Sequence, residues 1–353
     1  MVRIALVTNI PAPYREKLHE LISEQLQGHY TVIYCAEKES NREWKFNLGN
    51  YQKIFLSKFS KGHVHNNWKA WSELKKINPD VVVTNGFFPT MLYAFAWCMF
   101  YKRKHLVFTD GTLKSEQHLS KLHLFIRKYI LKKTKAFVGT SNGSIQLYES
   151  FGIKKERIFR SYLCIDNDKF SSHSFEKKYH LMFSGQFIER KLPFFFIEVA
   201  RIVKERMGNC KVLLIGSGPL AEKMTEKLRE YKIDYDYPGF IEQQQLPEYY
   251  SQSRLLLFPT KLDPWGVVVN EAMAAGVPVI TCENAGVADD LVISGKTGYV
   301  LPLSEEVWAD KAISILTQPK LYQEISANAK EHVQKYNFQN AAKGFIDAIR
   351  ASL

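Results

Sequence analysis

Two carboxylates lie eight residues apart on either side of a glycine within residues 258–280, FPTKLDPWGVVVNEAMAAGVPVI. Asp263 comes shortly before Gly266, and Glu271 follows it. The apolar residues after Gly266 recur at helical spacing, so we expect a helix that begins there and ends at Gly276. Asp263 then lies just before the N-terminus of this helix, and Glu271 lies in its second turn.

The start of this helix is suited to binding a phosphate. The first amides of a helix have no carbonyl partner within it, and here they belong to Gly266, Val267 and Val268. The carboxylates on either side accept hydrogen bonds from hydroxyl groups. A sugar nucleotide has a diphosphate between two sets of hydroxyl groups. The helix amides would bind the diphosphate, and the two carboxylates would bind the hydroxyl groups on either side of it. A solvated loop aspartate and an ordinary helix glutamate are the alternative. The loop follows a strand expected at residues 255–258, where open α/β sheets bind ligands, which favours the sugar nucleotide.

A second loop with suitable chemistry follows the strand expected at residues 179–185. It contains Gly185 and Gln186, and it places Arg190 and Lys191 at the start of an apolar helix. Lys191, together with Arg190, would neutralise a diphosphate as it leaves. The alternative is a surface lysine at a helix start.

The segment DPWGVVVNEAMAAGVPVI resembles the E-x7-E segment of the retaining GT-B-fold glycosyltransferases of family GT4. Asp263 stands in the place of the first glutamate, and Glu271 matches the second. The resemblance covers the C-terminal half in order. It implies transfer of a hexose from a nucleoside-diphosphate sugar, most often a UDP-sugar such as UDP-glucose, with retention at the anomeric carbon. GDP stays open as the nucleotide.

The resemblance also implies roles for residues outside this segment. Lys191 matches the lysine of the family's G-R-x4-K segment, whereas Gln186 stands where the arginine usually is. Gly216, in a Gly-Ser-Gly-Pro loop, corresponds to a position close to the nucleotide, although alone this loop could simply turn the chain. The remaining positions implied to line the donor site, where the backbone reads the base, are Phe240, Ile241 and Leu246.

The first half departs from the family pattern at two places. Thr109 stands where a catalytic histidine is common, and Asp110 follows it. Asp110 is therefore our candidate for a catalytic base or sugar ligand, with a turn aspartate that caps the next helix as the alternative. The first loop, residues 10–15, lacks the usual glycine pair and contains Arg15, which could bind a phosphate or lie on the surface. Because this loop has no G-x-G-x-x-G pattern, a nicotinamide cofactor is disfavoured.

Composition and charge limit the class of protein. The 353 residues are 46% hydrophobic and 24% charged, which is typical of a globular chain of two domains. No apolar run is long enough to span a bilayer, and the N-terminus has no export pattern. The five scattered cysteines indicate buried thiols in a reducing cytosol.

Residues 1–170 contain 27 Lys and Arg against 14 Asp and Glu, a net charge of +13, whereas residues 171–353 have a net charge of −1. The basic half favours an anionic partner.

Strands and helices alternate along the chain. In the first half we expect strands at residues 3–8, 30–35, 51–56, 79–84, 105–109 and 136–140, and helices include residues 15–27 and 68–77. This alternation predicts doubly wound parallel sheets. We expect two facing Rossmann-like domains, of the GT-B type. Residues 1–170 would bind the acceptor, residues 171–337 would bind the nucleotide sugar, and a helix at 338–353 would pack back on the first domain. A polar linker at 169–178 would join them.

Two segments of the first half bear on membranes. Residues 91–101, MLYAFAWCMFY, precede a basic triplet, and we expect them to form a buried helix. Residues 114–135 would form a basic amphipathic helix with Leu122, Ile126 and Tyr129 on its apolar face and Arg127 among its basic residues. It could lie on an anionic membrane or pack on the core with a solvated basic face. We therefore expect a cytoplasmic protein, with peripheral contact at the inner face of the membrane.

The expected activity is glycosyl transfer without a metal. Lys191 and the helix start supply positive charge at the diphosphate, and the sequence has no His/Cys ligand cluster. A saccharide or lipid-diphosphate-linked glycan would suit the basic half as acceptor, in polysaccharide or glycan biosynthesis. The alternatives are a sugar-nucleotide 2-epimerase of the same fold and a non-catalytic scaffold that binds carbohydrate or RNA. Because most aromatic residues fall on expected core faces, nucleic-acid binding is disfavoured.

Overall fold

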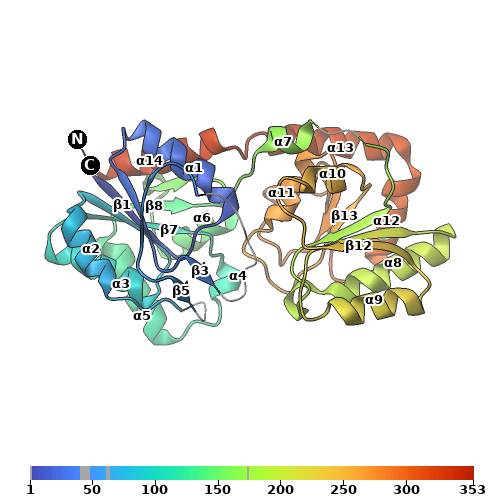
Figure 1. Ribbon diagram of the computed structural model, residues 1–353, viewed down its shortest axis with the longest axis horizontal. Helices are drawn as coiled ribbons and strands as arrows, with labels where there is room; N and C mark the ends of the chain where they lie inside the picture. The colour runs from blue at the N-terminus through green and yellow to red at the C-terminus, as the bar shows by residue number, and fades with distance from the viewer. Residues whose placement is uncertain (1, 40–47, 61–63, 173–174) are drawn as a thin grey trace. The chain divides into compact units, whose positions relative to one another are not determined.

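The computed structural model describes residues 2–39, 48–60, 64–172 and 175–353 (Figure 1). The chain forms two compact units. The first consists of Met1–Cys164 and Phe338–Leu353, and the second consists of Ile165–Asn337. Each unit is built on one large parallel sheet with helices packed against it.

The first unit is built on a seven-stranded parallel sheet in the order β4-β2-β1-β6-β7-β8-β9. Valine, isoleucine and leucine fill its central strands on both faces, as a parallel sheet covered by helices requires. A separate two-stranded sheet pairs β3 with β5. The strands are β1 (Ile4–Thr8), β2 (Tyr30–Tyr34), β3 (Lys38–Glu39), β4 (Gln52–Phe55), β5 (Phe59–Ser60), β6 (Val81–Asn85), β7 (Lys104–Thr109), β8 (Ala136–Gly139) and β9 (Ile158–Arg160).

Two helices that are distant in the sequence, α1 and α14, pack on each other in the first unit. Pro13 at the first position of α1 fixes a helical φ, so this helix begins two residues earlier than the sequence predicts. On α14, Phe345 packs against Tyr30 and Phe108. The helices of this unit are α1 (Pro13–Gln25), α2 (Lys69–Ile77), α3 (Pro89–Phe100), α4 (Leu113–Glu116), α5 (Lys121–Lys133), α6 (Asn142–Ser150), the short η1 (Lys155–Arg157) and α14 (Phe338–Ser352).

The apolar segment 91–101 packs one side in the core of the first unit, whereas the expectation of a buried helix is wrong for Phe100, which is exposed. Met91, Phe95, Trp97 and Cys98 of α3 are buried. Ala94 and Trp97 pack with α2 and with strands β1 and β6, and Phe95 packs with α5 and strand β7. The helices α2, α3 and α5 therefore cover one stretch of the sheet (Figure 1).

The single basic helix predicted over residues 114–135 is wrong in detail, because the structure has two helices there. Thr112 caps α4, and Ser120 starts α5 by accepting a hydrogen bond from the amide of His123. Arg127 is not a solvated member of the basic face, since its guanidinium forms an ion pair with Glu116 of α4. Short-range capping by serine and threonine outcompetes one continuous helix at this point.

The second unit is built on a six-stranded parallel sheet in the order β12-β11-β10-β13-β14-β15. One core cluster of this unit includes Phe183, Phe196 and Trp308, which lie where the sheet meets the helices α8 and α12. The strands are β10 (Leu181–Ser184), β11 (Lys211–Ile215), β12 (Asp234–Gly239), β13 (Leu256–Phe258), β14 (Val279–Thr281) and β15 (Tyr299–Val300). The helices are α7 (Asn167–Ser171), η2 (Glu189–Lys191), α8 (Pro193–Met207), α9 (Ala221–Glu230), α10 (Leu246–Ser251), α11 (Val267–Ala274), α12 (Glu305–Thr317) and α13 (Pro319–Val333).

The segment expected as an irregular linker begins with a helix. Asp166 caps α7 by accepting a hydrogen bond from the amide of Lys169, and Asn167 donates to the carbonyls of Val333 and Tyr336. These contacts tie α7 to the second unit, so the division lies at residues 164 and 165. The positions 173–174 of the expected linker lie outside the described residues.

All five cysteines are buried and unpaired, as the sequence predicts. Among the described residues, no helix combines the length and the apolar character that crossing a bilayer requires.

Candidate functional site

The order of strands in the second sheet brings the two predicted loops together. The central strand β10 pairs with β11 on one side and with β13 on the other, so the connections run outward in opposite directions from this point. The loops that follow β10 and β13 leave the carboxyl ends of neighbouring strands at this reversal, where open α/β sheets bind ligands. The first loop contains Arg190 and Lys191, and the second contains Asp263 and Gly266.

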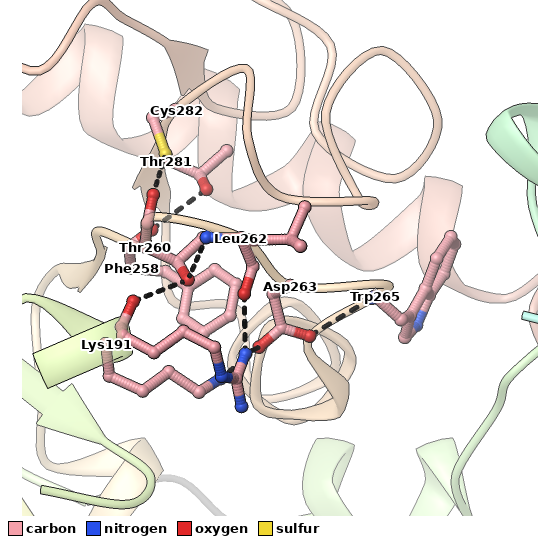
Figure 2. Close-up of polar contacts among 9 residues, drawn as sticks. Lys191, Phe258, Thr260, Leu262, Asp263, Trp265, Thr281 and Cys282 are labelled. Atoms are coloured by element: carbon pink, nitrogen blue, oxygen red, sulfur yellow. Dashed lines mark hydrogen bonds and ion pairs between the residues drawn. The ribbon is translucent and has the colours of Figure 1, made fainter. Parts of the chain in front are cut away.

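Hydrogen bonds fix the two loops to each other (Figure 2). The carbonyl of Arg190 accepts from the Thr260 hydroxyl at 3.0 Å and from the Lys261 amide at 2.8 Å. The thiol of Cys282 donates to the Thr260 carbonyl at 3.2 Å, which ties the same loop to the end of β14. The loop positions are therefore set by backbone contacts as well as by side chains.

A carboxylate and two cations meet between these loops (Figure 2). The Lys191 ammonium forms an ion pair with Asp263, and Nη1 of Arg190 lies 3.3 Å from Oδ2 of the same carboxylate. Nη1 of Arg190 also donates to the Leu262 carbonyl at 2.6 Å. The side chains of Lys191 and Asp263 are only 12% and 11% exposed, whereas that of Arg190 is 41% exposed. The Lys191–Asp263 pair is thus shielded from water, and Arg190 lies at its solvent side.

The cations keep Asp263 ionised. Burial alone would raise the pKa of this carboxyl, but the charges of Lys191 and Arg190 and the Trp265 amide outweigh burial and lower the pKa. The Trp265 amide donates to Oδ1 of Asp263 at 3.1 Å, which fixes the side chain just before helix α11. A carboxylate held in this way accepts hydrogen bonds and cannot act as a proton donor.

The helix predicted to begin near Gly266 does so. Gly266 has φ +108°, and α11 extends from Val267 to Ala274. A Cβ at Gly266 would lie 2.5 Å from the Phe258 ring, so both conformation and space require glycine here. The ammonium of Lys191 lies 4.7 Å from the centroid of the same ring. The Phe258 ring therefore contacts both the start of α11 and the Lys191 side chain. Gly266, Val267 and Val268 are all partly exposed.

Glu271, which we expect to accept hydrogen bonds from a ligand, is buried. Its carboxylate accepts a hydrogen bond from the Tyr250 hydroxyl at 2.6 Å, and that hydroxyl lies 2.9 Å from the Ser184 hydroxyl at the end of β10. Burial raises the pKa of Glu271 to about 7, although the bond from Tyr250 opposes this shift. Glu271 therefore changes its charge close to neutral pH.

The Gly-Ser-Gly-Pro loop does more than turn the chain. A Cβ at Gly216 would lie 1.9 Å from the Gly185 carbonyl oxygen, and one at Gly218 would lie 2.5 Å from that of Phe187. The amide of Gly216 donates to the Gly239 carbonyl at the end of β12. The glycines let this loop pack against the loop after β10. Phe240, whose ring is exposed, directly follows Gly239. Three further predicted positions are partly exposed: Gln186 in the loop after β10, Ile241 in the loop after β12, and Leu246 at the start of α10.

Asp110 belongs to the first unit, not to this cluster. It follows β7, directly after Thr109, whose hydroxyl accepts from the Gly111 amide at 3.0 Å. Burial and the charge of Asp110 raise the pKa of the Tyr148 hydroxyl, which places Asp110 close to that group. The cap of α4 is Thr112, so Asp110 is not the residue that starts this helix.

Sequence reasoning missed several residues that build the site. Thr260 joins the two loops, and Tyr250, which also contacts Ser184, binds Glu271. Trp265 donates from Nε1 to Oδ1 of Asn270 at 2.8 Å. These residues are buried and lie far apart in the sequence or between predicted motifs. Only Trp265 carried a signal, as a large aromatic residue directly before Gly266. In the part of the chain that the structure describes, no three His, Cys, Asp or Glu side chains gather in a way that would hold a metal ion.

Comparison with known proteins matches both halves of the chain. Residues 165–332 match the family described as "Glycosyl transferases group 1", and residues 18–169 match "Glycosyltransferase Family 4". The chain belongs to the group 1 glycosyltransferases. This glycosyltransferase shares its two-domain GT-B fold with Anabaena HepE, solved in complex with UDP, at a TM-score of 0.77 and 12% identity over 99% of this chain and 100% of that one.

Two curated relatives are similar in sequence. A 41.2 kDa protein in the cps region of Klebsiella pneumoniae is 22% identical over 80% of this glycosyltransferase and 78% of its own length. The capsular polysaccharide biosynthesis glycosyltransferase CapM of Staphylococcus aureus is 26% identical over 60% of the chain and 54% of its own length.

Proposed function

We propose that this glycosyltransferase transfers a hexose from a UDP-sugar to a saccharide or lipid-diphosphate-linked saccharide, with retention at the anomeric carbon and without a metal ion. The observation that carries the proposal is the shielded cluster of Lys191, Arg190 and Asp263 beside the start of α11. Two cations next to the free amides at a helix start form a site for an anion. A carboxylate beside them can accept hydrogen bonds from hydroxyl groups.

The leaving group gives each part of this cluster a role. When the bond to the sugar breaks, negative charge grows on the β-phosphate of the nucleotide. Lys191 and the amides of Val267 and Val268 would stabilise this charge in a site from which water is largely excluded. Asp263 would then accept hydrogen bonds from the sugar hydroxyls, and its ionised state suits this role.

Glu271 would hold the ribose. Its ionised carboxylate accepts two hydroxyl hydrogens more strongly than a neutral carboxyl does. The base would pack near Phe240 and Ile241, after β12. UDP is our choice of nucleotide because the resemblance to GT4 favours it and because HepE, whose fold this chain shares, has been solved with UDP-glucose.

The acceptor is proposed from the charge of the first unit and from the relatives. The basic first unit suits an anionic acceptor such as a lipid-linked diphosphate saccharide, and the names of the relatives point to polysaccharide biosynthesis. Such an acceptor would bring the enzyme to the cytoplasmic face of a membrane. Asp110 is the candidate base or sugar ligand on this unit. Retention rests on the resemblance, since no protein nucleophile is assigned.

Calorimetry with UDP, GDP and ADP tests the nucleotide, and we expect UDP to bind most tightly. Release of UDP from UDP-glucose, with and without a lipid-diphosphate-linked saccharide, then tests transfer, and NMR of the anomeric proton in the product tests retention. Activity in excess EDTA should equal activity without it. Conversion of the UDP-sugar to its 2-epimer would identify an epimerase, and nucleotide binding without turnover of any sugar would identify a non-catalytic scaffold.

A further inference from the structure

An unusual number of apolar side chains face solvent on the helices α2, α3 and α5 of the first unit. Phe100 and Phe125 are 71% and 70% exposed, and Leu122, Trp68 and Tyr129 are each more than half exposed. The two buried clusters described above for these helices contain none of them and use other sides of the same helices. Exposed apolar groups that gather in this way mark an interaction surface.

Ring contacts make this surface continuous from α2 across α3. Trp68 stacks on Trp71 with centroids 5.3 Å apart, and Tyr93 of α3 meets Trp68 edge-on at 4.8 Å. The ring centroid of Trp71 in turn lies 5.9 Å from that of Phe100 and 6.2 Å from that of Tyr101. Aromatic residues therefore extend over both helices without interruption.

Helix α5 extends the surface. Its Tyr129 meets the buried Phe95 of α3 edge-on, with ring centroids 6.2 Å apart, so α5 lies beside α3. Leu122, Phe125 and Tyr129 are three and four residues apart, so they form one stripe along α5, while Ile130 and Leu131 point into the core. A second stripe of exposed lysines runs beside the first at the same kind of spacing and consists of Lys121, Lys128 and Lys132.

The charge of this region is strongly positive. Residues 68–135 contain 13 Lys and Arg against 4 Asp and Glu, a net charge of +9. Three of the four acids are already neutralised within the region, because Glu73, Asp80 and Glu116 pair with Lys76, Arg103 and Arg127. The lysines of α5 therefore face solvent in a field with little opposing charge.

We infer that the outer side of α2, α3 and α5 docks on an anionic phospholipid bilayer. Aromatic rings and leucine on a helix enter the boundary between headgroups and acyl chains, while lysines beside them reach the phosphates. A nucleic acid would use the lysines and would stack on exposed rings, but it would gain nothing from burying the aliphatic Leu122, whereas a bilayer would. The inference deepens the proposed function, because a lipid-linked acceptor would be met at this surface.

Sedimentation with vesicles tests the surface directly. The protein should bind vesicles of equimolar phosphatidylcholine and phosphatidylglycerol at low salt, and binding should fall at high salt. Changing Lys121, Lys128 and Lys132 to Gln should weaken binding about fivefold per lysine, on the order of 100-fold in total. Changing Leu122, Phe125 and Tyr129 to Ser should weaken binding at least about tenfold at unchanged charge.

The matched control changes three exposed lysines of the second unit, Lys223, Lys296 and Lys320, to Gln and should leave vesicle binding within about twofold of wild type. An equal loss in this control, or no sedimentation of wild type at low salt, would overturn the inference. Circular dichroism and UDP calorimetry on the same variants separate the two proposals. Variants that bind UDP but not vesicles support the docking surface, and wild type that binds vesicles but no nucleotide contradicts only the proposed donor.

Discussion

Lys191 and Arg190 contact the same carboxylate but differ in burial, and this difference should decide their importance. The Lys191 side chain is 12% exposed and that of Arg190 is 41% exposed, so water screens the charge of Arg190 far more. A shielded cation next to a helix start stabilises a departing diphosphate more than one at the rim does.

We therefore predict that Lys191→Ala lowers kcat by roughly 100-fold to 1,000-fold, the effect typical of losing one oxyanion-stabilising group. Arg190→Ala should lower kcat by less than about tenfold because its charge is screened. Steady-state release of UDP from UDP-glucose measures both. The control is Lys261→Ala, which removes an exposed lysine from the neighbouring loop after β13 and should leave kcat unchanged. A Lys191→Ala enzyme as active as this control would contradict the assigned role.

The burial of Glu271 predicts a pH dependence. Its pKa is raised to about 7 in the folded protein, so the folded state holds a proton that the unfolded state, with a value near 4.5, has lost. The contribution of Glu271 to the free energy of unfolding should therefore decline as pH rises from about 4.5 to about 7 and stay low above that. Glu271→Gln should remove this decline in urea titrations at several pH values.

Nucleotide binding should show the opposite trend. If the ionised carboxylate holds the ribose, the affinity for UDP-glucose should fall as pH drops below about 7, approaching tenfold per pH unit. UDP-glucose is the suitable probe because it lacks the terminal phosphate that titrates near 6. Calorimetry should give a flat profile for Glu271→Gln, and a flat profile for wild type would rule out this role.

At the scale of elements, the start of α11 depends on one glycine that two constraints fix at once. Gly266 has φ +108°, and the Phe258 ring occupies the space where a Cβ would lie. Gly295 also has a positive φ, +75°, but nothing lies within 4 Å of the position of its Cβ. The two glycines thus separate backbone strain from steric conflict.

We predict that Gly266→Ala lowers the free energy of unfolding by about 2–4 kcal/mol and abolishes UDP binding, because the first turn of α11 must move away from Phe258. Gly295→Ala should cost only about 1 kcal/mol, from strain alone, and should bind UDP as wild type does. Urea unfolding and calorimetry measure the two effects. Equal loss of stability in the two variants would show that the clash with Phe258 is relieved without cost.

At the scale of the whole molecule, the chain returns to its first unit at the end. Helix α14 follows the second unit in sequence, yet Phe345 packs on Tyr30 and Phe108 of the first unit. A Cβ at Gly344 would lie 1.7 Å from the Arg160 carbonyl oxygen, so the helix also approaches the end of β9 closely. The first unit therefore depends on residues more than 170 positions away from its other part.

We predict that Phe345→Ala destabilises the first unit by about 3–5 kcal/mol, as truncation of a buried phenylalanine does. In calorimetric unfolding, one transition should shift to lower temperature, while the transition that UDP raises should stay in place, because the nucleotide residues belong to the second unit. Lys343→Ala, on the exposed side of the same helix, should change stability by no more than about 0.5 kcal/mol. A shift of both transitions by Phe345→Ala would mean that the units unfold together.

The elements around the candidate site were recognisable from the sequence because their signals are local. The strand before Pro259, the helix after Gly266, and the lysine after Gly185 depend on neighbours within a few residues, and the structure has each element where these signals place it. The parallel αβ alternation, and with it the fold class, follows from the same kind of signal.

Three features were decided only by the tertiary structure. The contact between the loops at Arg190 and Thr260 depends on which strands become neighbours, and the sequence does not state that order. The burial that raises the pKa of Glu271 comes from Tyr250 and the sheet, not from its own helix. The division of α5 into a core side and a stripe of exposed Leu122 and Phe125 was hidden too, because periodicity shows that a residue is apolar but not what covers it. Packing between distant segments decides which groups lose water, and that loss sets both charge and exposure.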